Sequence, residues 1–341
     1  MHSFALGIGT QNTRGDWLEV YYPAPLVHPD DGLAAAVQTA LEAPAGTAAV
    51  SFLPEDCAAL ADALQSAGHP EQAELAEALS HSRRPLVAML LDSDRPPQTT
   101  PEVYLKLHLL SHRLVKPHGV DLTGMFGLLR NVAWTSEGAI DVDELPARRL
   151  KARLEGRPLS VASVDKFPRM ADYVVPEGVR IGDAARVRLG AYLGEGTTVM
   201  HEGFVNFNAG SEGPGMIEGR VSAGVIVGRG SDLGGGSSTM GTLSGGGSLT
   251  IRVGEDCLIG ANAGVGIPLG DRCTVEAGLY VTAGTRVTLI DADGNEAGIV
   301  TARELAGQSD LLLRRHSRTG RIECLTNQSA AALNEALHVH N

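Results

Sequence analysis

Aliphatic residues recur at every sixth position through much of the second half of this chain. The runs comprise Val175, Ile181, Val187, Leu193, Val199 and Val205; Val221, Val227 and Leu233; Val253, Ile259 and Val265; and Leu269, Val275, Val281 and Val287. Six consecutive matches are difficult to obtain by chance, so ordinary strands joined by glycine turns are the less favoured interpretation. The breaks between runs predict loops inserted into a repeat.

Glycine is concentrated in the same region, since 27 of the 42 glycines lie between Gly178 and Gly284. Several follow the periodic aliphatics directly, as Gly182 follows Ile181. Glycine suits a tight corner because it tolerates positive φ and has no Cβ. Spacing and glycine together predict the hexapeptide repeat of a left-handed parallel β-helix, in which three six-residue faces form a coil of about eighteen residues.

The glycine-rich stretch GSDLGGGSSTMGTLSGGG, residues 230–247, fits this repeat. It lacks the lysine that a Walker-type phosphate loop requires. Leu233 and Val253 keep the six-residue spacing on either side, so a flexible linker is also unsuitable. We expect Gly234 to Gly236 at a corner of the helix and Gly241 to Gly247 in an inserted loop.

The remaining chain has other patterns. Apolar residues at helical spacing alternate with short strand-like runs before residue 150, and a hairpin is expected to turn at Asn12 to Gly15. The predicted organisation is an N-terminal α/β domain (1–150), a connector (151–174), the β-helix (175–290) and a C-terminal cap (291–341). Within the cap we expect a hairpin at Asp293-Gly294, strands at 311–317 and 321–326, and a helix near 330–337.

Composition excludes some functions. The formal net charge of −12 argues against a general nucleic-acid binder, because neutralising phosphates requires clustered Lys and Arg. The four cysteines form no CxxC pair, which indicates reduced thiols rather than zinc or disulfides. No signal peptide or long apolar run is present, so we expect a cytoplasmic protein without membrane contacts.

Longer stretches, spread over nearly the whole chain, are more specific than the repeat. They are YLKLHLLSHRLVKPHGV, SVDKFPRMADYVVP, MHEGFVNFNAG, GMIEGRVSAGVIVG, LIGANAGVGIPLGD, VEAGLYVTAGT and LLLRRHS. These stretches resemble tetrahydrodipicolinate N-succinyltransferase, in the long form found in actinobacteria and pseudomonads. The resemblance implies a homotrimer with active sites between subunits. It also implies transfer of succinyl from succinyl-CoA to the amino group of ring-opened tetrahydrodipicolinate, on the diaminopimelate route to lysine.

The resemblance also implies the site residues. Glu218, in MIEGR, matches the family's acyl-carrying glutamate, and could act instead as a general base for direct attack by the amine. Arg220 would meet a carboxylate of succinyl or of the acceptor. The other predicted succinyl-CoA contacts are Gly235, Ser238, Ala261, Glu276, Ala277, Gly284, Arg314, Arg315, His316 and Ser317.

The chain departs from the family pattern at three positions. Thr301 stands where relatives can have lysine, and His316 stands in place of an expected asparagine. Relatives are also described with metal near the threefold axis. Glu202 matches one ligand and would favour Mg²⁺, whereas the matching Asp position is Ala185.

Four rival functions share the predicted fold. A γ-class carbonic anhydrase needs three histidines for zinc, and His201 is the single histidine between Val175 and Val287. Many hexapeptide acyltransferases use a histidine base, for which His201 would be the candidate, although a structural role suits a lone histidine better. An acetyl-CoA-dependent transferase and a catalytically silent scaffold remain as alternatives.

Overall fold

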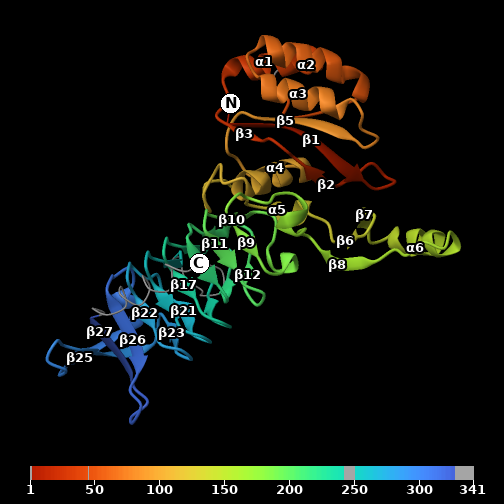
Figure 1. The fold of residues 1–341 in the computed structure, drawn as a ribbon. Coiled ribbons are helices and arrows are strands. Elements are labelled where there is room, and N and C mark those ends of the chain that lie inside the picture. The colour runs from red at the N-terminus through yellow and green to blue at the C-terminus, as the bar shows by residue number, and fades with distance from the viewer. Residues whose placement is uncertain (1, 45, 242–249, 327–341) are drawn as a thin grey trace. The chain divides into compact units, whose positions relative to one another are not determined.

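A computed structural model describes residues 2–44, 46–241 and 250–326. The chain divides into two compact units (Figure 1). The second unit comprises the chain from Val175 onward together with Lys116–His118 and Arg169–Ala171, and the first unit comprises the rest. None of the described helices is long and apolar enough to cross a membrane.

The first unit contains helices and two small sheets. Its helices are α1 (Asp31–Ala40), α2 (Cys57–Ser66), α3 (Pro70–Leu79), α4 (Thr100–Ser111), α5 (Met125–Leu128) and α6 (Leu145–Leu154). Its strands are β1 (Ser3–Gln11), β2 (Trp17–Tyr21), β3 (Leu26–Val27), β4 (Ala49–Phe52), β5 (Leu86–Leu91), β6 (Val132–Thr135), β7 (Gly138–Asp141) and β8 (Val161–Asp165).

The larger sheet of this unit has the order β2-β1-β5-β4, with β3 beside β1, and each of its strand pairs is antiparallel. Its core packs Phe4, Leu6 and Leu90 against apolar side chains of α2 and α3, such as Leu60 and Ala76. The apolar spacing of these helices produces the buried face.

The smaller sheet, β7-β6-β8, packs with α6 around Ala133 and Ile140. This arrangement differs from the predicted boundaries. Residue 150 falls inside α6, and the segment predicted as a connector supplies the end of α6 and the whole of β8. The basic, polar sequence of α6 hides its small apolar contact with the sheet.

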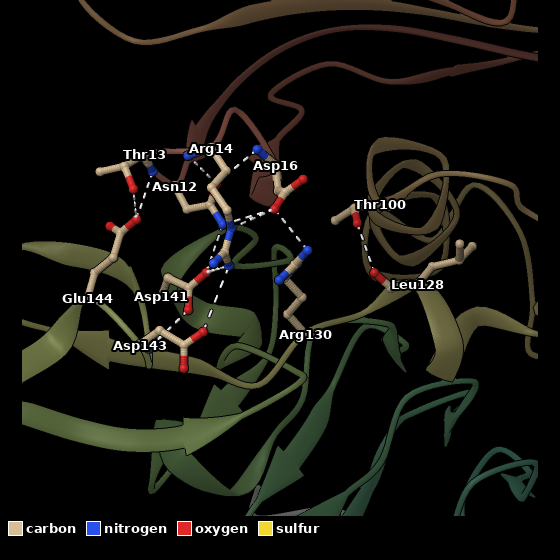
Figure 2. Close-up of polar contacts among 10 residues, drawn as sticks. All are labelled: Asn12, Thr13, Arg14, Asp16, Thr100, Leu128, Arg130, Asp141, Asp143 and Glu144. Carbon is tan, nitrogen blue, oxygen red and sulfur yellow. Dashed lines mark hydrogen bonds and ion pairs between the residues drawn. The ribbon is translucent and has the colours of Figure 1, made fainter.

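The predicted hairpin between β1 and β2 turns at residues 12–16, and its tip binds the smaller sheet (Figure 2). The side-chain oxygen of Asn12 accepts hydrogen bonds from the amides of Arg14 and Asp16. The Asn12 amide group donates to Asp141 Oδ2 at 2.8 Å, and Thr13 N donates to Glu144 Oε1 at 2.7 Å. The turn residues therefore join the two sheets of this unit.

His108 is fully buried on α4 and makes hydrogen bonds through both ring nitrogens. Nδ1 lies 2.7 Å from the carbonyl oxygen of Tyr104, and Nε2 lies 3.2 Å from the amide nitrogen of Tyr22. A neutral ring protonated on Nδ1 satisfies both contacts, since Nδ1 donates and Nε2 accepts. Burial lowers the pKa of His108 to about 3.

Acid is therefore expected to destabilise the protein through His108. Below about pH 6.5 the unfolded chain binds a proton that the folded chain excludes until about pH 3, so unfolding becomes easier by about 1.4 kcal/mol per pH unit. The His108→Gln variant should unfold at lower temperature at neutral pH, but with a weaker pH dependence. Unfolding midpoints measured by calorimetry between about pH 7 and pH 4 give the slope of stability against pH for the wild type and for the variant. Parallel slopes would contradict this assignment.

The second unit is a three-sided parallel β-helix, whose strands stack along one axis from β9 and β11 to β22 and β26 (Figure 1). Face one contains β9 (Arg180–Ile181), β11 (Thr197–Val199), β14 (Gly215–Ile217), β17 (Asp232–Leu233), β20 (Leu258–Ile259), β22 (Thr274–Val275) and β26 (Leu311–Arg315). Face two contains β12 (Phe204–Val205), β15 (Arg220–Val221), β18 (Ser238–Thr239), β21 (Gly264–Gly266) and β23 (Tyr280–Thr282). Face three contains β10 (Ala191–Leu193), β13 (Ala209–Ser211), β16 (Ile226–Val227) and β19 (Arg252–Val253).

The periodic aliphatics form the core of this helix, with two corrections. Val175 is 69% exposed, so the buried series begins after it. The predicted loop between Val205 and Val221 is instead a continuing coil, with Ser211 and Ile217 buried at the six-residue spacing. Ser211 interrupts the apolar pattern but remains satisfied, because its hydroxyl accepts a hydrogen bond from Gly213 N.

The coils differ in length. Val205 pairs with Val221, so this coil is sixteen residues long and two residues shorter than the preceding one. Leu233 pairs with Ile259, twenty-six residues further on, which leaves room for the predicted inserted loop. Of the predicted loop, Gly241 to Gly247, residues 242–247 lie outside the described residues.

The C-terminal segment adds to the end of the helix. The predicted hairpin is formed by β24 (Arg286–Ile290) and β25 (Glu296–Thr301). Strand β26 then extends face one, since Val275 pairs with Leu313, and β27 (Ile322–Thr326) pairs with β26. The helix predicted near 330–337 lies outside the described residues.

Candidate functional site

The corner between face one and face two brings together most of the predicted site residues. The residue after each face-one strand donates its amide hydrogen bond to the next coil, so these positions form a vertical row. We call this row the site edge. In coil order it contains Gly182, Met200, Glu218, Gly234, Gly260 and Glu276, and it ends beside Arg314, which follows Leu313 within β26.

Glu218 lies in the middle of the site edge. Its amide donates to Leu233 O at 2.8 Å, which fixes the backbone, and the side chain is partly buried. A Cβ placed on Gly235 would lie 3.4 Å from Glu218 Oε2, so the carboxylate extends over the next coil. Among the described residues this carboxylate makes no hydrogen bond or ion pair, and it is available to a ligand.

The edge beyond Glu218 is almost free of side chains. Gly235, Ala261 and Ala277 occupy successive coils there, as Asn262 N bonds to Gly235 O and Gly278 N bonds to Ala261 O. Within the described part of the chain, the amides of these three residues donate no hydrogen bond. An extended ligand could therefore approach the backbone closely and accept hydrogen bonds from it.

Glu276, Arg314 and Arg315 lie at the far end of the site edge. The Glu276 carboxylate accepts a 2.6 Å hydrogen bond from the amide of Arg315. Arg314 forms an ion pair of 3.0 Å with Glu323, whose side chain is 2% exposed. Arg315 makes no ion pair among the described residues, and its guanidinium donates to Gly320 O. Of the two predicted cations, Arg314 is thus paired with a buried carboxylate, although its own side chain stays 43% exposed.

His316 and Ser317 begin the turn after β26. His316 accepts a hydrogen bond of 3.2 Å at Nδ1 from Thr319 N, and Ser317 is exposed. Gly284 follows β23 and is exposed, since a Cβ added to it would have no atom within 4 Å. This glycine lies at the opposite edge of face two from the site edge. The structure therefore does not bring Gly284 to the site edge.

Arg220 lies on the outer surface of face two, two residues after Glu218. Its Nε lies 3.3 Å from Ser238 Oγ, and the guanidinium is exposed. Further along this face the ring of Tyr280 occupies the space where a side chain on Gly264 would lie. Arg220 makes no ion pair among the described residues, so its charge is available beside Glu218.

Glu202 lies close to the site edge, one coil before Glu218. Its carboxylate pairs with Arg186 Nη2 at 2.9 Å and contacts His201 Nδ1 at 3.1 Å. The described residues contain no group of three or more His, Cys, Asp or Glu that could hold a metal ion. One carboxylate already paired with an arginine does not form a magnesium site within a single chain.

A hollow of about 460 Å³ beside the site edge was not predicted from the sequence. It lies on the first coils of face one, and its lining includes Arg180, Thr198, Met200 and His201. These residues point outward from the repeat, and outward positions follow no periodic pattern. The arginine at position 180 was the available signal for a binding site. The sequence does not show, however, which coils line the hollow around this residue.

The fold agrees with known proteins. The family model described as hexapeptide repeat of succinyl-transferase matches residues 250–283. A solved structure from Campylobacter jejuni, described as a 2,3,4,5-tetrahydropyridine-2-carboxylate N-succinyltransferase, is 31% identical with a TM-score of 0.86, covering 96% of this chain and 93% of that one. The second unit is thus the left-handed parallel β-helix of a hexapeptide acyltransferase.

Full-length relatives specify the family. Proteins of Pseudomonas putida (63% identical, covering 100% of this chain and 99% of the relative) and Vibrio cholerae (56%, covering 100% of both) are named 2,3,4,5-tetrahydropyridine-2,6-dicarboxylate N-succinyltransferase. The family model described as tetrahydrodipicolinate N-succinyltransferase middle also matches residues 129–169. The chain belongs to the tetrahydrodipicolinate N-succinyltransferase family.

Proposed function

We propose that this chain transfers succinyl from succinyl-CoA to the amino group of ring-opened tetrahydrodipicolinate, yielding N-succinyl-2-amino-6-oxopimelate and CoA. The names of full-length relatives support this reaction. The structural observation that supports the proposal most directly is the position of the Glu218 carboxylate. This carboxylate is unpaired among the described residues and lies at the start of an edge without large side chains. A thioester carbonyl placed there lies next to a group that can accept a proton or attack.

Two routes use Glu218. In direct transfer, the amine attacks the thioester carbon, its proton passes to the Glu218 carboxylate, and the thiolate leaves with that proton as CoA thiol. In the covalent route, a Glu218 oxygen attacks and the thiolate leaves. The amine then takes the succinyl group from the anhydride, which frees the Glu218 carboxylate, and its proton passes to the thiolate to give CoA thiol. Because an anhydride is less stable than a thioester, this route requires rapid capture by the amine.

The rest of the site edge suits the CoA portion of the donor. The amides of Gly235, Ala261 and Ala277 would bind polar groups along the pantetheine arm, and Arg315 would meet the anionic end of CoA. Ser238 would orient Arg220 through the 3.3 Å contact. Arg314 contributes less charge to this end because of its pairing with Glu323.

A homotrimer is part of the proposal. The exposed edge of one chain covers only one side of a bound ligand, and a neighbouring copy of the chain would cover the other side of that ligand. Magnesium at Glu202 remains a prediction, and it would require ligands from more than one copy around an axis. Light scattering measures the assembly, and equilibrium dialysis with magnesium measures the metal. The cytoplasmic location also stays a prediction.

Thiol release with purified protein tests the reaction. Succinyl-CoA with tetrahydrodipicolinate should release CoA and yield a succinylated product by mass spectrometry, and acetyl-CoA should react more slowly. Equal activity with both donors would count against the succinyl assignment. Absence of thiol release with either donor would favour a scaffold instead.

Removing Arg220 should weaken binding of the succinyl donor selectively. In Arg220→Ala, the Kd for succinyl-CoA should rise roughly tenfold to a hundredfold, since a hydrogen bond to a charged group contributes about 1.5–3 kcal/mol. The Kd for acetyl-CoA should change little, because acetyl has no distal carboxylate. Calorimetric titration gives both values, with Arg229→Ala, another exposed arginine of the β-helix, as the control. Equal weakening for both donors would place Arg220 elsewhere in the site.

A further inference from the structure

The hollow on the first coils of face one has the chemistry of an anion-binding site. Arg180 lines it, and a second, smaller hollow of about 200 Å³ shares Arg180 and Thr198. The guanidinium of Arg180 is exposed and makes no hydrogen bond or ion pair among the described residues. A planar, permanently charged group in a concave surface suits a carboxylate, to which it can donate two parallel hydrogen bonds.

The coil register places this hollow relative to Glu218. Thr198 pairs with Arg180 on one side and with Met216 on the other. Arg180 therefore lies two coils before the strand that leads into Glu218. Neighbouring strands lie about 4.8 Å apart, so the two coils are separated by about 10 Å. This separation is comparable to the length of an extended seven-carbon dicarboxylate.

Met200 and His201 connect the hollow to the catalytic edge. Met200 N donates to Ile217 O at 2.9 Å, which places Met200 directly beside Glu218 in the site edge. The edge beyond Glu218, in the other direction, is the bare stretch assigned to CoA. The hollow and the bare stretch thus lie on opposite sides of Glu218, as two substrates meeting at one carboxylate require.

We propose that Arg180 in this hollow binds the carboxylate of the amino acceptor that lies farther from the reacting amine. The inference rests on the proposed function and deepens it by locating the acceptor. Arg180 acts as a specificity-determining residue, because it selects acceptors with a second carboxylate. Met200 and His201 form the wall along which the carbon chain runs toward Glu218.

The test compares Arg180→Ala and Arg180→Lys with wild type in steady-state kinetics. In Arg180→Ala the KM for tetrahydrodipicolinate should rise about tenfold or more, while the KM for succinyl-CoA stays near the wild-type value. Arg180→Lys should recover part of the loss, since lysine keeps the charge without the planar pair of donors. Arg229→Ala, at a different corner of the β-helix, is the matched control and should leave both KM values unchanged.

Direct binding of pimelate, a seven-carbon dicarboxylate, separates this inference from the proposed function. Calorimetry should show weaker pimelate binding in Arg180→Ala than in wild type. An active wild type with an unchanged acceptor KM in Arg180→Ala would overturn the inference alone. An inactive wild type would overturn the proposed function, and pimelate binding would then decide the inference: Arg180-dependent binding supports it, and equal or absent binding rejects it.

Discussion

The Glu218→Gln variant is expected to lose about 10²- to 10⁴-fold in kcat, while the Kd for succinyl-CoA changes little. Glutamine keeps the shape of the side chain but cannot accept the amine proton or attack the thioester. The carboxylate makes no hydrogen bond or ion pair among the described residues, so its replacement should leave the fold intact. Thiol release measures kcat, and unfolding midpoints check stability.

A matched control distinguishes this role from general loss of charge. Glu255→Gln changes another exposed glutamate of the β-helix, at the corner between face three and face one, and should retain wild-type activity. Comparable activity in Glu218→Gln and Glu255→Gln would rule out Glu218 as the catalytic group. Exchange of labelled CoA into succinyl-CoA without acceptor would identify the covalent route, because direct transfer produces no exchange.

Replacing Gly235 with valine should raise the Kd for succinyl-CoA by more than about tenfold without unfolding the protein. The backbone at Gly235 is not in the positive-φ region, and a Cβ there would meet only Glu218 Oε2, at 3.4 Å. Valine therefore fits the fold but fills the bare stretch of the site edge. Calorimetric titration with succinyl-CoA measures the loss.

Substitution of the neighbouring Gly234 should instead destabilise the fold. A Cβ on Gly234 would lie 2.8 Å from Ala261 N and 2.9 Å from Ile259 O, both backbone atoms. Gly234→Val should therefore push neighbouring coils apart and lower the unfolding midpoint, at a cost of at least about 1–3 kcal/mol. If Gly235→Val destabilises the fold as much as Gly234→Val, weaker CoA binding cannot be assigned to the groove.

The β-helix was predictable because its core repeats in sequence. Leu193, Val227 and Ile259 are fully buried at positions set by the six-residue spacing. The prediction was wrong at two positions where residue type and six-residue spacing do not match burial in the core. Val175 keeps the spacing but lies outside the core, whereas Ser211 lies in the core because a backbone amide satisfies its hydroxyl.

The candidate site was partly predictable. Resemblance placed Glu218 and Gly235 in one site, and the site edge brings them together. It also grouped Arg314 with Arg315, but the return of β27 pairs Arg314 with Glu323, whereas Arg315 makes no ion pair among the described residues. The hollow at Arg180 was not predicted, since residues from separate coils line it and the sequence does not show which coils meet there.

The sequence by itself determined the repeating core, the glycine corners and the family, because each depends on residue type at regular spacing or in long continuous stretches. The tertiary structure decided which outward-facing residues become neighbours. Sixteen-residue and twenty-six-residue coils interrupt the regular repeat, so the stacking of Met200, Glu218 and Gly234 depends on where backbone hydrogen bonds form. Catalytic geometry follows from that register, because substrates contact the residues that the coils align along one edge.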